Sequence, residues 1–386
     1  TIHQSMNLYG IRDDNPLNRN NRQEQEEWET IAGAELSWYL QLSNSLRFNF
    51  RGDMHWSEIA GRYNDTAFRY NDPLFNVDEA LLNITIHGAG SVMAGKTMRK
   101  HGAALLLPVT NFLYDETIEN TTENHGKWMA GFSFYRGIVS VAGWHAPIAD
   151  WVPDAYAPPD RDGLDAMFLL NSTVTADIHR IGFVYYHNRA HKAGVYYSGQ
   201  LGDSFIPYAE IAVSNRPLVP SCMPPDTVLS RSDSWSFDGL VGGSYYFTNI
   251  NTAVYMEYRY RTSGYTDNDW NVVAEGLSNP GLTSPALIGA IANALPYLHT
   301  PVHTLGMRIQ NTRQIGELFD YGINLFWLAP YGMYIRGEGA VSLFDRLKVS
   351  LGASYIPSFG NKGESRWWNK TWQIDLALQW SVRTAE

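Results

Sequence analysis

The stretch from Ser45 to Trp56 alternates apolar and polar side chains at almost every position. The two sets are Leu46, Phe48, Phe50, Met54 and Trp56 against Arg47, Asn49, Arg51, Asp53 and His55. Successive side chains of a strand point to opposite faces, so the pattern predicts a strand with one apolar and one ionic face. Its length is close to the about 9–11 residues with which a tilted strand crosses a bilayer.

The same alternation recurs along the chain, in segments separated by turn residues. Such a series is typical of a transmembrane antiparallel β-barrel, and we count about 18 strands, with 16–18 as the expected range. The predicted strands are Ile2–Ile11, Trp28–Leu42, Ser45–Trp56, Asn76–His87, Ser91–Lys100, Lys127–Arg136, Ile138–His145, Leu164–Asp177, Ile181–Asn188, Val195–Leu201, Ser204–Val213, Ser234–Thr248, Ile250–Thr262, Val302–Asn311, Ile315–Leu328, Tyr331–Phe344, Leu347–Ile356 and a final strand from Trp372 to Val382.

The connections between these segments alternate between short and long. Bacterial barrels have short periplasmic turns and long extracellular loops. We therefore expect both termini to be periplasmic, in the outer membrane of a Gram-negative-type (diderm) bacterium. The connections expected on the opposite side are Asp13–Glu27, Ser57–Phe75, Ala146–Gly163, Ser214–Asp233 and Ser263–Pro301.

Composition agrees with one barrel domain over residues 1–386. Aromatic residues make up 13% of the chain, charged residues 18% and hydrophobic residues 44%, and no apolar run is long enough for a helical membrane span. The net charge of -10 argues against a nucleic-acid partner. Strand pattern begins at residue 2, so we expect a mature, exported chain. The alternative is a soluble all-β protein such as a propeller, which would show a blade-length repeat that we do not find.

A hairpin in the first third of the chain carries a loose sequence motif. Glu79-Ala80-Leu81, Gly95-Lys96-Thr97 and Gly102 resemble the hairpin of outer-membrane porin families related to alginate-export-type channels. Thr97 stands where that motif has glutamine, and His101 where it has tryptophan. The resemblance covers residues 77–102 and implies a wide outer-membrane channel, without implying a substrate.

The residues Gly90–Thr97 also match the formal pattern of a phosphate-binding loop. A true phosphate loop follows a buried parallel strand and opens a helix. This stretch instead opens an alternating strand after a tight turn, so we do not expect nucleotide binding.

Charged residues of both signs occupy the polar positions of the predicted strands, which alternate with the apolar ones. One interpretation is solvation of a water-filled pore with pairing across it, and the other is a selectivity constriction. Arg47 and Arg51 would form a short basic ladder that favours anions, unless Asp53 and Glu79 neutralise it. The candidate pore-lining or solute-binding residues are Arg47, Arg51, Asp53, Glu79, Glu257, Arg259, Arg261, Arg336, Glu338 and Asp375.

The longest connection, residues 263–301, contains the apolar and helix-compatible stretch Pro285–Leu295. It would either enter the barrel as a constriction or plug, or pack on other loops or a partner. We expect no catalytic residue, metal or cofactor. A nucleophile motif of the G-x-S-x-G type is absent, and the aspartates at 160–165 and 267–269 lack the frame of a calcium loop.

These patterns predict an outer-membrane porin or channel for passive or facilitated diffusion of small polar or charged solutes. The expected partners are the lipid bilayer and small polar or anionic solutes, with a partner protein or homo-oligomer left open. Two alternatives remain at this point. One is a barrel scaffold that sheathes or docks a partner complex, and the other is an outer-membrane hydrolase.

Overall fold

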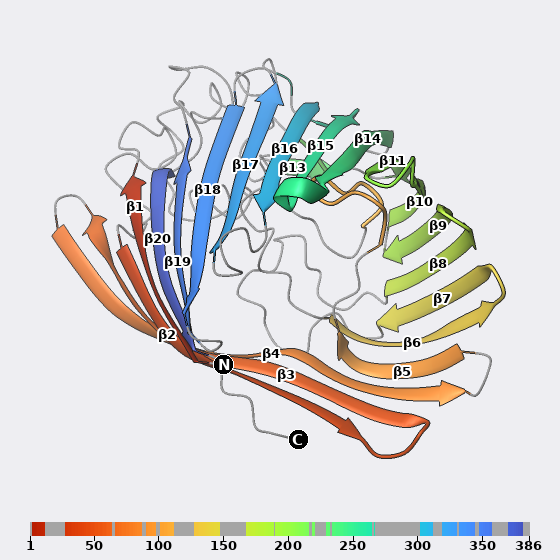
Figure 1. The fold of residues 1–386 in the computed structure, drawn as a ribbon, viewed down its shortest axis with the longest axis horizontal. Helices are drawn as coiled ribbons and strands as arrows, with labels where there is room; N and C mark the ends of the chain where they lie inside the picture. The colour runs from red at the N-terminus through yellow and green to blue at the C-terminus, as the bar shows by residue number, and fades with distance from the viewer. Residues whose placement is uncertain are drawn as a thin grey trace.

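The barrel is described by a computed structural model (Figure 1). The described residues are 2–11, 28–63, 66–86, 90–97, 101–111, 127–146, 167–188, 190–215, 218–220, 229–231, 234–264, 266, 302–311, 319–329, 332–343, 347–356 and 370–380. Among these residues, no helix is long and apolar enough to cross a membrane.

An 18-stranded antiparallel sheet closes on itself, because the first strand pairs with the last as well as with the second. The predicted count and fold class are therefore confirmed. The barrel strands are β1 (Ile2–Ile11), β2 (Trp28–Gln41), β3 (Leu46–Tyr63), β4 (Thr66–Ile86), β5 (Gly90–Thr97), β6 (Lys127–Arg136), β7 (Val139–Ala146), β8 (Met167–Ala176), β9 (His179–Asn188), β10 (Ala190–Gly199), β11 (Phe205–Asn215), β14 (Trp235–Phe247), β15 (Thr252–Arg261), β16 (His303–Asn311), β17 (Phe319–Ala329), β18 (Gly332–Leu343), β19 (Leu347–Tyr355) and β20 (Lys370–Trp380).

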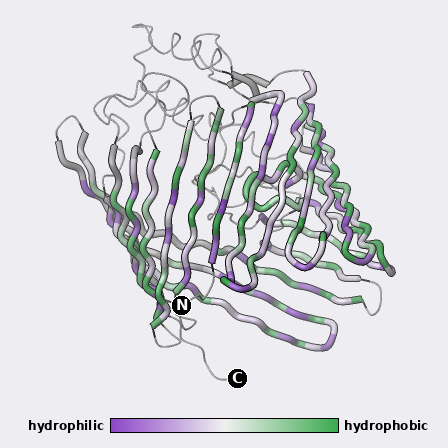
Figure 2. Tube along the Cα trace, turned by 45° about the horizontal axis from the view of Figure 1, so that its top comes forward, coloured by the Kyte–Doolittle hydropathy of each residue, from purple (hydrophilic) through white to green (hydrophobic). Residues whose placement is uncertain are grey.

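The apolar parity of each strand faces outward. On β4, Leu82, Ile84 and Ile86 are exposed, while Leu81 of the opposite parity is buried. The alternation is visible along the strands as successive hydrophobic and hydrophilic positions (Figure 2). An exposed apolar surface that surrounds the whole sheet is typical of a lipid-facing barrel.

The short turns predicted between residues 42 and 45 and at Asn249 are confirmed. Between β2 and β3, the Leu42 N–H donates to the Leu46 carbonyl at 2.9 Å, and the Ser43 hydroxyl accepts from the Leu46 N–H at 3.1 Å. Between β14 and β15, a 3-10 turn (Thr248–Ile250) is followed by Asn251 with φ 47°. Asparagine tolerates this left-handed conformation better than most residues, which suits it to a tight turn.

The connection predicted over Ser57–Phe75 is wrong, because these residues extend β3 and β4. The ladder runs on through Ser57 opposite Asp72 to Tyr63 opposite Thr66. The predicted connection included Pro73, and proline cannot donate to a sheet ladder. Among the described residues, β5 pairs with β4 only from Ala80 onward, so Pro73 lies in a part of β4 with one described neighbour.

Three further differences concern smaller elements. β10 begins at Ala190, five residues before its predicted start at Val195. The connection predicted over Ser214–Asp233 includes two short paired strands, β12 (Leu218–Pro220) and β13 (Leu229–Arg231). Gly90–Thr97 forms β5, which pairs antiparallel with β4 and β6, so its context is not that of a phosphate loop.

The outward-facing apolar side chains lead to a testable prediction about contact with lipid. Replacing Leu376, or Leu82, by arginine should cost about 2–4 kcal/mol of folding free energy near the bilayer midplane, because the charge would enter hydrocarbon. Gln373→Arg on the strand of Leu376 is the matched control. It should cost far less, because Gln373 shares the inward parity of Asp375 and already contacts that carboxylate. Urea titration of the protein in vesicles measures the difference. Equal destabilisation by Leu376→Arg and Gln373→Arg would contradict the assignment of the two faces.

The strand order makes a second prediction, about sidedness. The strands that flank residues 64–65 and 267–301 end on the same side of the antiparallel barrel. Epitope tags inserted at these two places should both be labelled on intact cells, and a tag at Asn249 should not. Labelling at Asn249 alone would place the barrel the other way round.

Candidate functional site

Residues 101–111, which we call the inward segment, lie inside the barrel and are held there by two carboxylates. Glu210 stands in the middle of β11 and Glu257 in the middle of β15. Both side chains are buried, with exposed fractions of 1% and 0%. A glutamate at mid-strand on the inward parity can reach across the interior to a backbone that enters the barrel.

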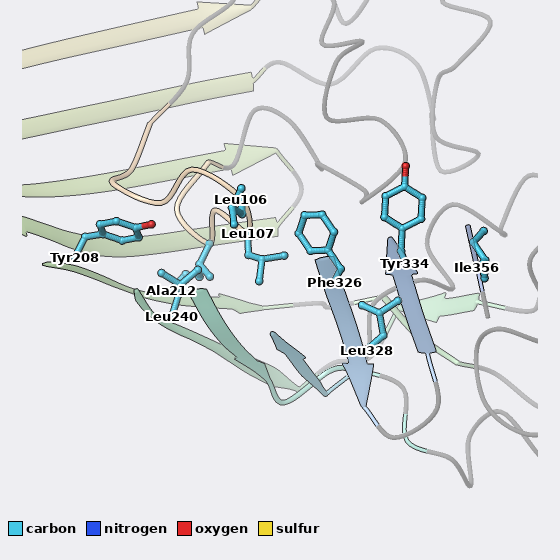
Figure 3. Packing of buried hydrophobic residues seen from close by; sticks show 10 residues of the cluster. Leu106, Leu107, Tyr208, Ala212, Leu240, Phe326, Leu328, Tyr334 and Ile356 are labelled. Atoms are coloured by element: carbon cyan, nitrogen blue, oxygen red, sulfur yellow. The ribbon is translucent and has the colours of Figure 1, made fainter. Parts of the chain in front are cut away.

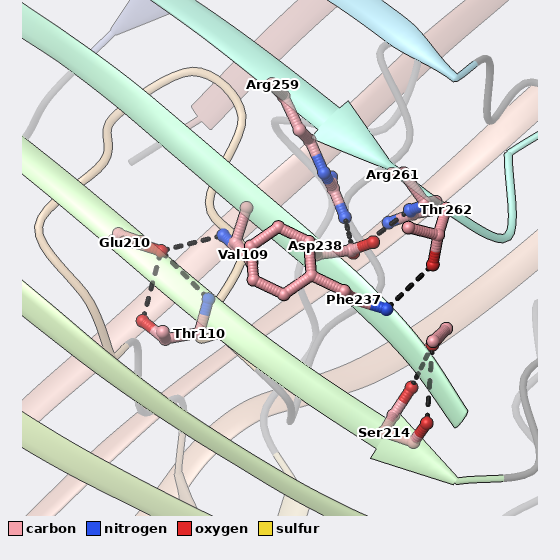
Figure 4. Close-up of polar contacts among 10 residues, drawn as sticks. Val109, Thr110, Glu210, Ser214, Phe237, Asp238, Arg259, Arg261 and Thr262 are labelled. Atoms are coloured by element: carbon pink, nitrogen blue, oxygen red, sulfur yellow. Dashed lines mark hydrogen bonds and ion pairs between the residues drawn. The ribbon is translucent and has the colours of Figure 1, made fainter.

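Glu210 binds both ends of the inward segment. Its Oε1 accepts the N–H groups of Ala103 and Ala104, the latter at 2.7 Å. Its Oε2 accepts from the N–H of Val109 at 2.7 Å and from the N–H and hydroxyl of Thr110 at 2.8 and 3.1 Å. The Oε2 contacts are drawn in Figure 4. One carboxylate therefore closes the segment into a compact loop.

Glu257 binds the middle of the same segment. Its oxygens accept the N–H groups of Leu105 at 2.7 Å, Leu106 at 3.0 Å and Leu107 at 2.6 Å. The hydroxyl of Tyr208 on β11 donates to Oε1 at 2.7 Å. Bonds to an ionised acceptor are roughly twice as strong as neutral ones, so this arrangement fixes the leucine backbone firmly.

The sequence of the segment matches this binding mode residue by residue. Every N–H from Ala103 to Thr110 is bound by one of the two carboxylates, and Pro108, the one residue between them without such a bond, has no N–H to donate. A buried charge is costly unless hydrogen bonds compensate it. Here each carboxylate is compensated by backbone donors that would otherwise be unsatisfied inside the barrel.

Gly102 is required where the segment begins. Its φ is +107°, and a Cβ there would lie 2.4 Å from Glu210 Oε1 and 2.6 Å from Thr110 Oγ1. Any side chain would therefore displace the carboxylate from the backbone it binds. This close approach gives a physical reason for the glycine at the end of the hairpin motif.

Apolar packing holds the inward segment on two sides. Leu106, Leu107 and Val109 belong to one buried cluster with residues of β11, β14, β17 and β18, shown in Figure 3. A second buried cluster covers the interior parity of β4 to β10. Ala103 packs against both, and the members of the second are Leu81, Met93, Met129, Trp144, Ala146, Leu169, Val184, Tyr186 and Tyr196. Much of the interior is thus apolar, contrary to the polar lumen that the strand pattern implied.

A charged wall lines another part of the interior, formed by Arg308, Arg336, Glu338 and Asp375. Arg336 and Glu338 share the strand face of Tyr334, which packs in the cluster of the inward segment. Arg336 Nη2 lies 3.0 Å from Asp375 Oδ2, while Arg308 and Arg336 lie 3.7 and 3.8 Å from the Glu338 carboxylate. The charges alternate in sign from β16 to β20.

The pair between β18 and β20 passes over Gly352 of β19. A Cβ at Gly352 would lie 3.1 Å from Asp375 Oδ2 and 3.4 Å from Arg336 Nη2. Without a side chain there, the two ions meet directly across the intervening strand. The absence of a side chain at Gly352 therefore allows Arg336 of β18 and Asp375 of β20 to form one continuous ionic surface across β19.

The other residues predicted as pore-lining fall into two groups. Arg47, Arg51 and Glu79 share the inward face with Leu81, and Arg51 forms a two-pronged contact with Glu35, at 3.0 Å and 3.4 Å. The side chain of Asp53 lies outside the described residues.

Arg259 and Arg261 on β15 both contact Asp238 on β14, at 2.8 and 3.0 Å (Figure 4). Glu257 is fully buried and binds the inward segment, so it does not face open water.

Sequence reasoning did not find the inward segment. For residues 263–301 it left open a constriction or packing on other loops or a partner, and Pro285–Leu295 lie outside the described residues. Two signals were present: the apolar run from Ala103 to Val109 directly after a strand, and Glu210 in an otherwise apolar strand. Neither signal indicates which residues contact each other, because more than 90 residues separate the inward segment from both glutamates.

Several solved structures share this architecture, each with low sequence identity. OccK11 (OpdR) of Pseudomonas aeruginosa superposes with a TM-score of 0.57 at 11% identity, covering 98% of this chain and 93% of that chain. OccAB1 of Acinetobacter baumannii gives 0.55 at 10%, covering 98% and 94%. Wzi of Escherichia coli, described as a carbohydrate-binding β-barrel involved in capsule assembly, gives 0.50 at 8%, covering 99% and 85%.

The fold is that of an outer-membrane β-barrel. No protein-family model matches the sequence, and no curated protein matches it. The resemblance to alginate-export-type families is therefore not confirmed. Among the described residues, no group of three or more His, Cys, Asp or Glu side chains is placed to hold a metal. The aspartates at 160–165 and 267–269 lie outside the described residues.

The two carboxylates make a testable prediction about stability. Glu257→Ala should destabilise the barrel by about 3–5 kcal/mol, because it leaves buried backbone donors without their charged acceptor. Asp320→Ala is the control: Asp320 is partly exposed and lies 3.7 Å from Lys348, so its loss should cost about 0–1 kcal/mol. Urea unfolding in vesicles measures both. Similar costs for the two variants would show that the inward segment is not held by Glu257.

Proposed function

We propose that this outer-membrane barrel is a channel for passive or facilitated diffusion of small polar or charged solutes, and that it is not an enzyme. The observation that carries the proposal is the inward segment. It narrows a closed barrel from within, and its carboxylate bonds fix it in place beside a charged wall. Channels achieve selectivity by such narrowing, with charged side chains placed along the path.

The division of the interior supports this function. The inward segment packs on apolar side chains of β11, β14, β17 and β18, so that part is filled. Arg308 and Glu338 of the charged wall keep exposed fractions of 33% and 42%, so their head groups meet water. A solute would therefore pass along the charged wall rather than through the barrel centre.

The scaffold and hydrolase alternatives make different demands. A scaffold would have its interior occupied by a partner and would not conduct alone. A hydrolase would need a nucleophile, a base and an orienting group in contact, and the interior contacts described here are ion pairs and carboxylate-to-backbone bonds instead. No observation on the described residues favours either alternative.

Planar-bilayer recording of the purified protein under a salt gradient tests the proposal. We expect stepwise increases in conductance and a reversal potential that reports ion preference. Correctly folded protein that inserts without any conductance would contradict the channel and favour the scaffold.

The basic ladder gives a selectivity prediction. Arg47 and Arg51 share an inward face, and charges in a narrow passage act more strongly than loop charges beyond the Debye length of about 8–10 Å. Arg47→Ala combined with Arg51→Ala should shift the reversal potential toward cation preference. Glu35→Ala should shift it the other way, because it removes an inward-facing carboxylate that contacts Arg51. An unchanged reversal potential in both variants would make these side chains structural.

A further inference from the structure

Leu105 differs from its neighbours in the inward segment. Its exposed fraction is 60%, whereas Leu106 and Leu107 are buried at 7% and 6%. A leucine that had freedom to turn would bury itself in the cluster that already holds Leu106. The Leu105 backbone has no such freedom, because its N–H donates to Glu257 Oε1 at 2.7 Å.

The exposed side chain of Leu105 faces the lumen. The carboxylates that bind the segment stand at the middle of β11 and β15, so the segment lies at mid-barrel height. Leu106 and Leu107 point into the cluster on the barrel wall, as Figure 3 shows. Leu105, which precedes them in the chain and is exposed, is therefore left on the open side of the segment.

The passage thus has two chemically different sides. The charged wall presents arginines and carboxylates within ion-pair distance of one another. The inward segment presents the exposed aliphatic side chain of Leu105. A solute that carries both charges and an apolar group can satisfy both sides at once, whereas an inorganic ion or a wholly polar zwitterion satisfies only one.

We propose that Leu105 is a specificity-determining residue, and that the channel prefers small amphipathic ions and zwitterions to wholly polar solutes of the same charge and size. This inference rests on the proposed channel function. The apolar contact raises the occupancy of the passage, and it is weak enough to let the solute leave, as conduction requires.

Liposome swelling with leucine and asparagine tests the proposal. Both are zwitterions of nearly equal size, and they differ in carrying an isobutyl or a carboxamide side chain. Liposomes with the wild-type protein should swell about fourfold faster in leucine, the factor expected for transfer of roughly one methylene group from water. In Leu105→Ser the two rates should become equal, with single-channel conductance in KCl retained.

Leu201→Ser is the matched control. Leu201 is exposed to a similar extent, 57%, and lies in the turn between β10 and β11. It should keep the wild-type preference for leucine. Equal rates in the wild type, or an unchanged preference in Leu105→Ser, would overturn the inference while leaving the channel intact. Absence of swelling and of KCl conductance in every protein would overturn the proposed function and this inference with it.

Discussion

The interior of this barrel depends on two buried carboxylates that take up a backbone with no strand partner. A chain that enters a closed barrel carries N–H groups that must be satisfied there, since the cost of leaving them unpaired is high. Glu210 and Glu257 satisfy seven of these groups in succession. The donors in turn compensate the burial of two charges, so each partner makes the other tolerable.

This mutual dependence explains the local sequence. Gly102 provides room for the Glu210 carboxylate, and Pro108 occupies a position at which no donor is needed. Leu106 and Leu107 add apolar contact with the wall, so the segment is fixed by its backbone and by its side chains. A segment fixed in both ways keeps one shape, as the proposed channel requires.

The apolar clusters and the charged wall divide the interior unequally. The outward face of the sheet is largely apolar, whereas the inner face is apolar from β4 to β10 and ionic from β16 to β20. The same alternation of side chains therefore produces one type of outer surface, which is apolar, and two types of inner surface, one apolar and one ionic. In the proposed channel, the passage follows the ionic part, where Arg308 and Glu338 keep contact with water.

The sequence by itself determined the barrel, its strand count and the two faces of each strand, because the alternation of side chains is a local property. It also placed Arg336, Glu338 and Asp375 on the inward parity, but it could not pair them, since their contact depends on Gly352 in a third strand. Local turn signals misled it at Pro73, where the ladder of β3 continued past them. Only the tertiary structure decided where the chain enters the barrel. That choice rests on glutamates more than 90 residues away, which become neighbours of the inward segment when the sheet closes.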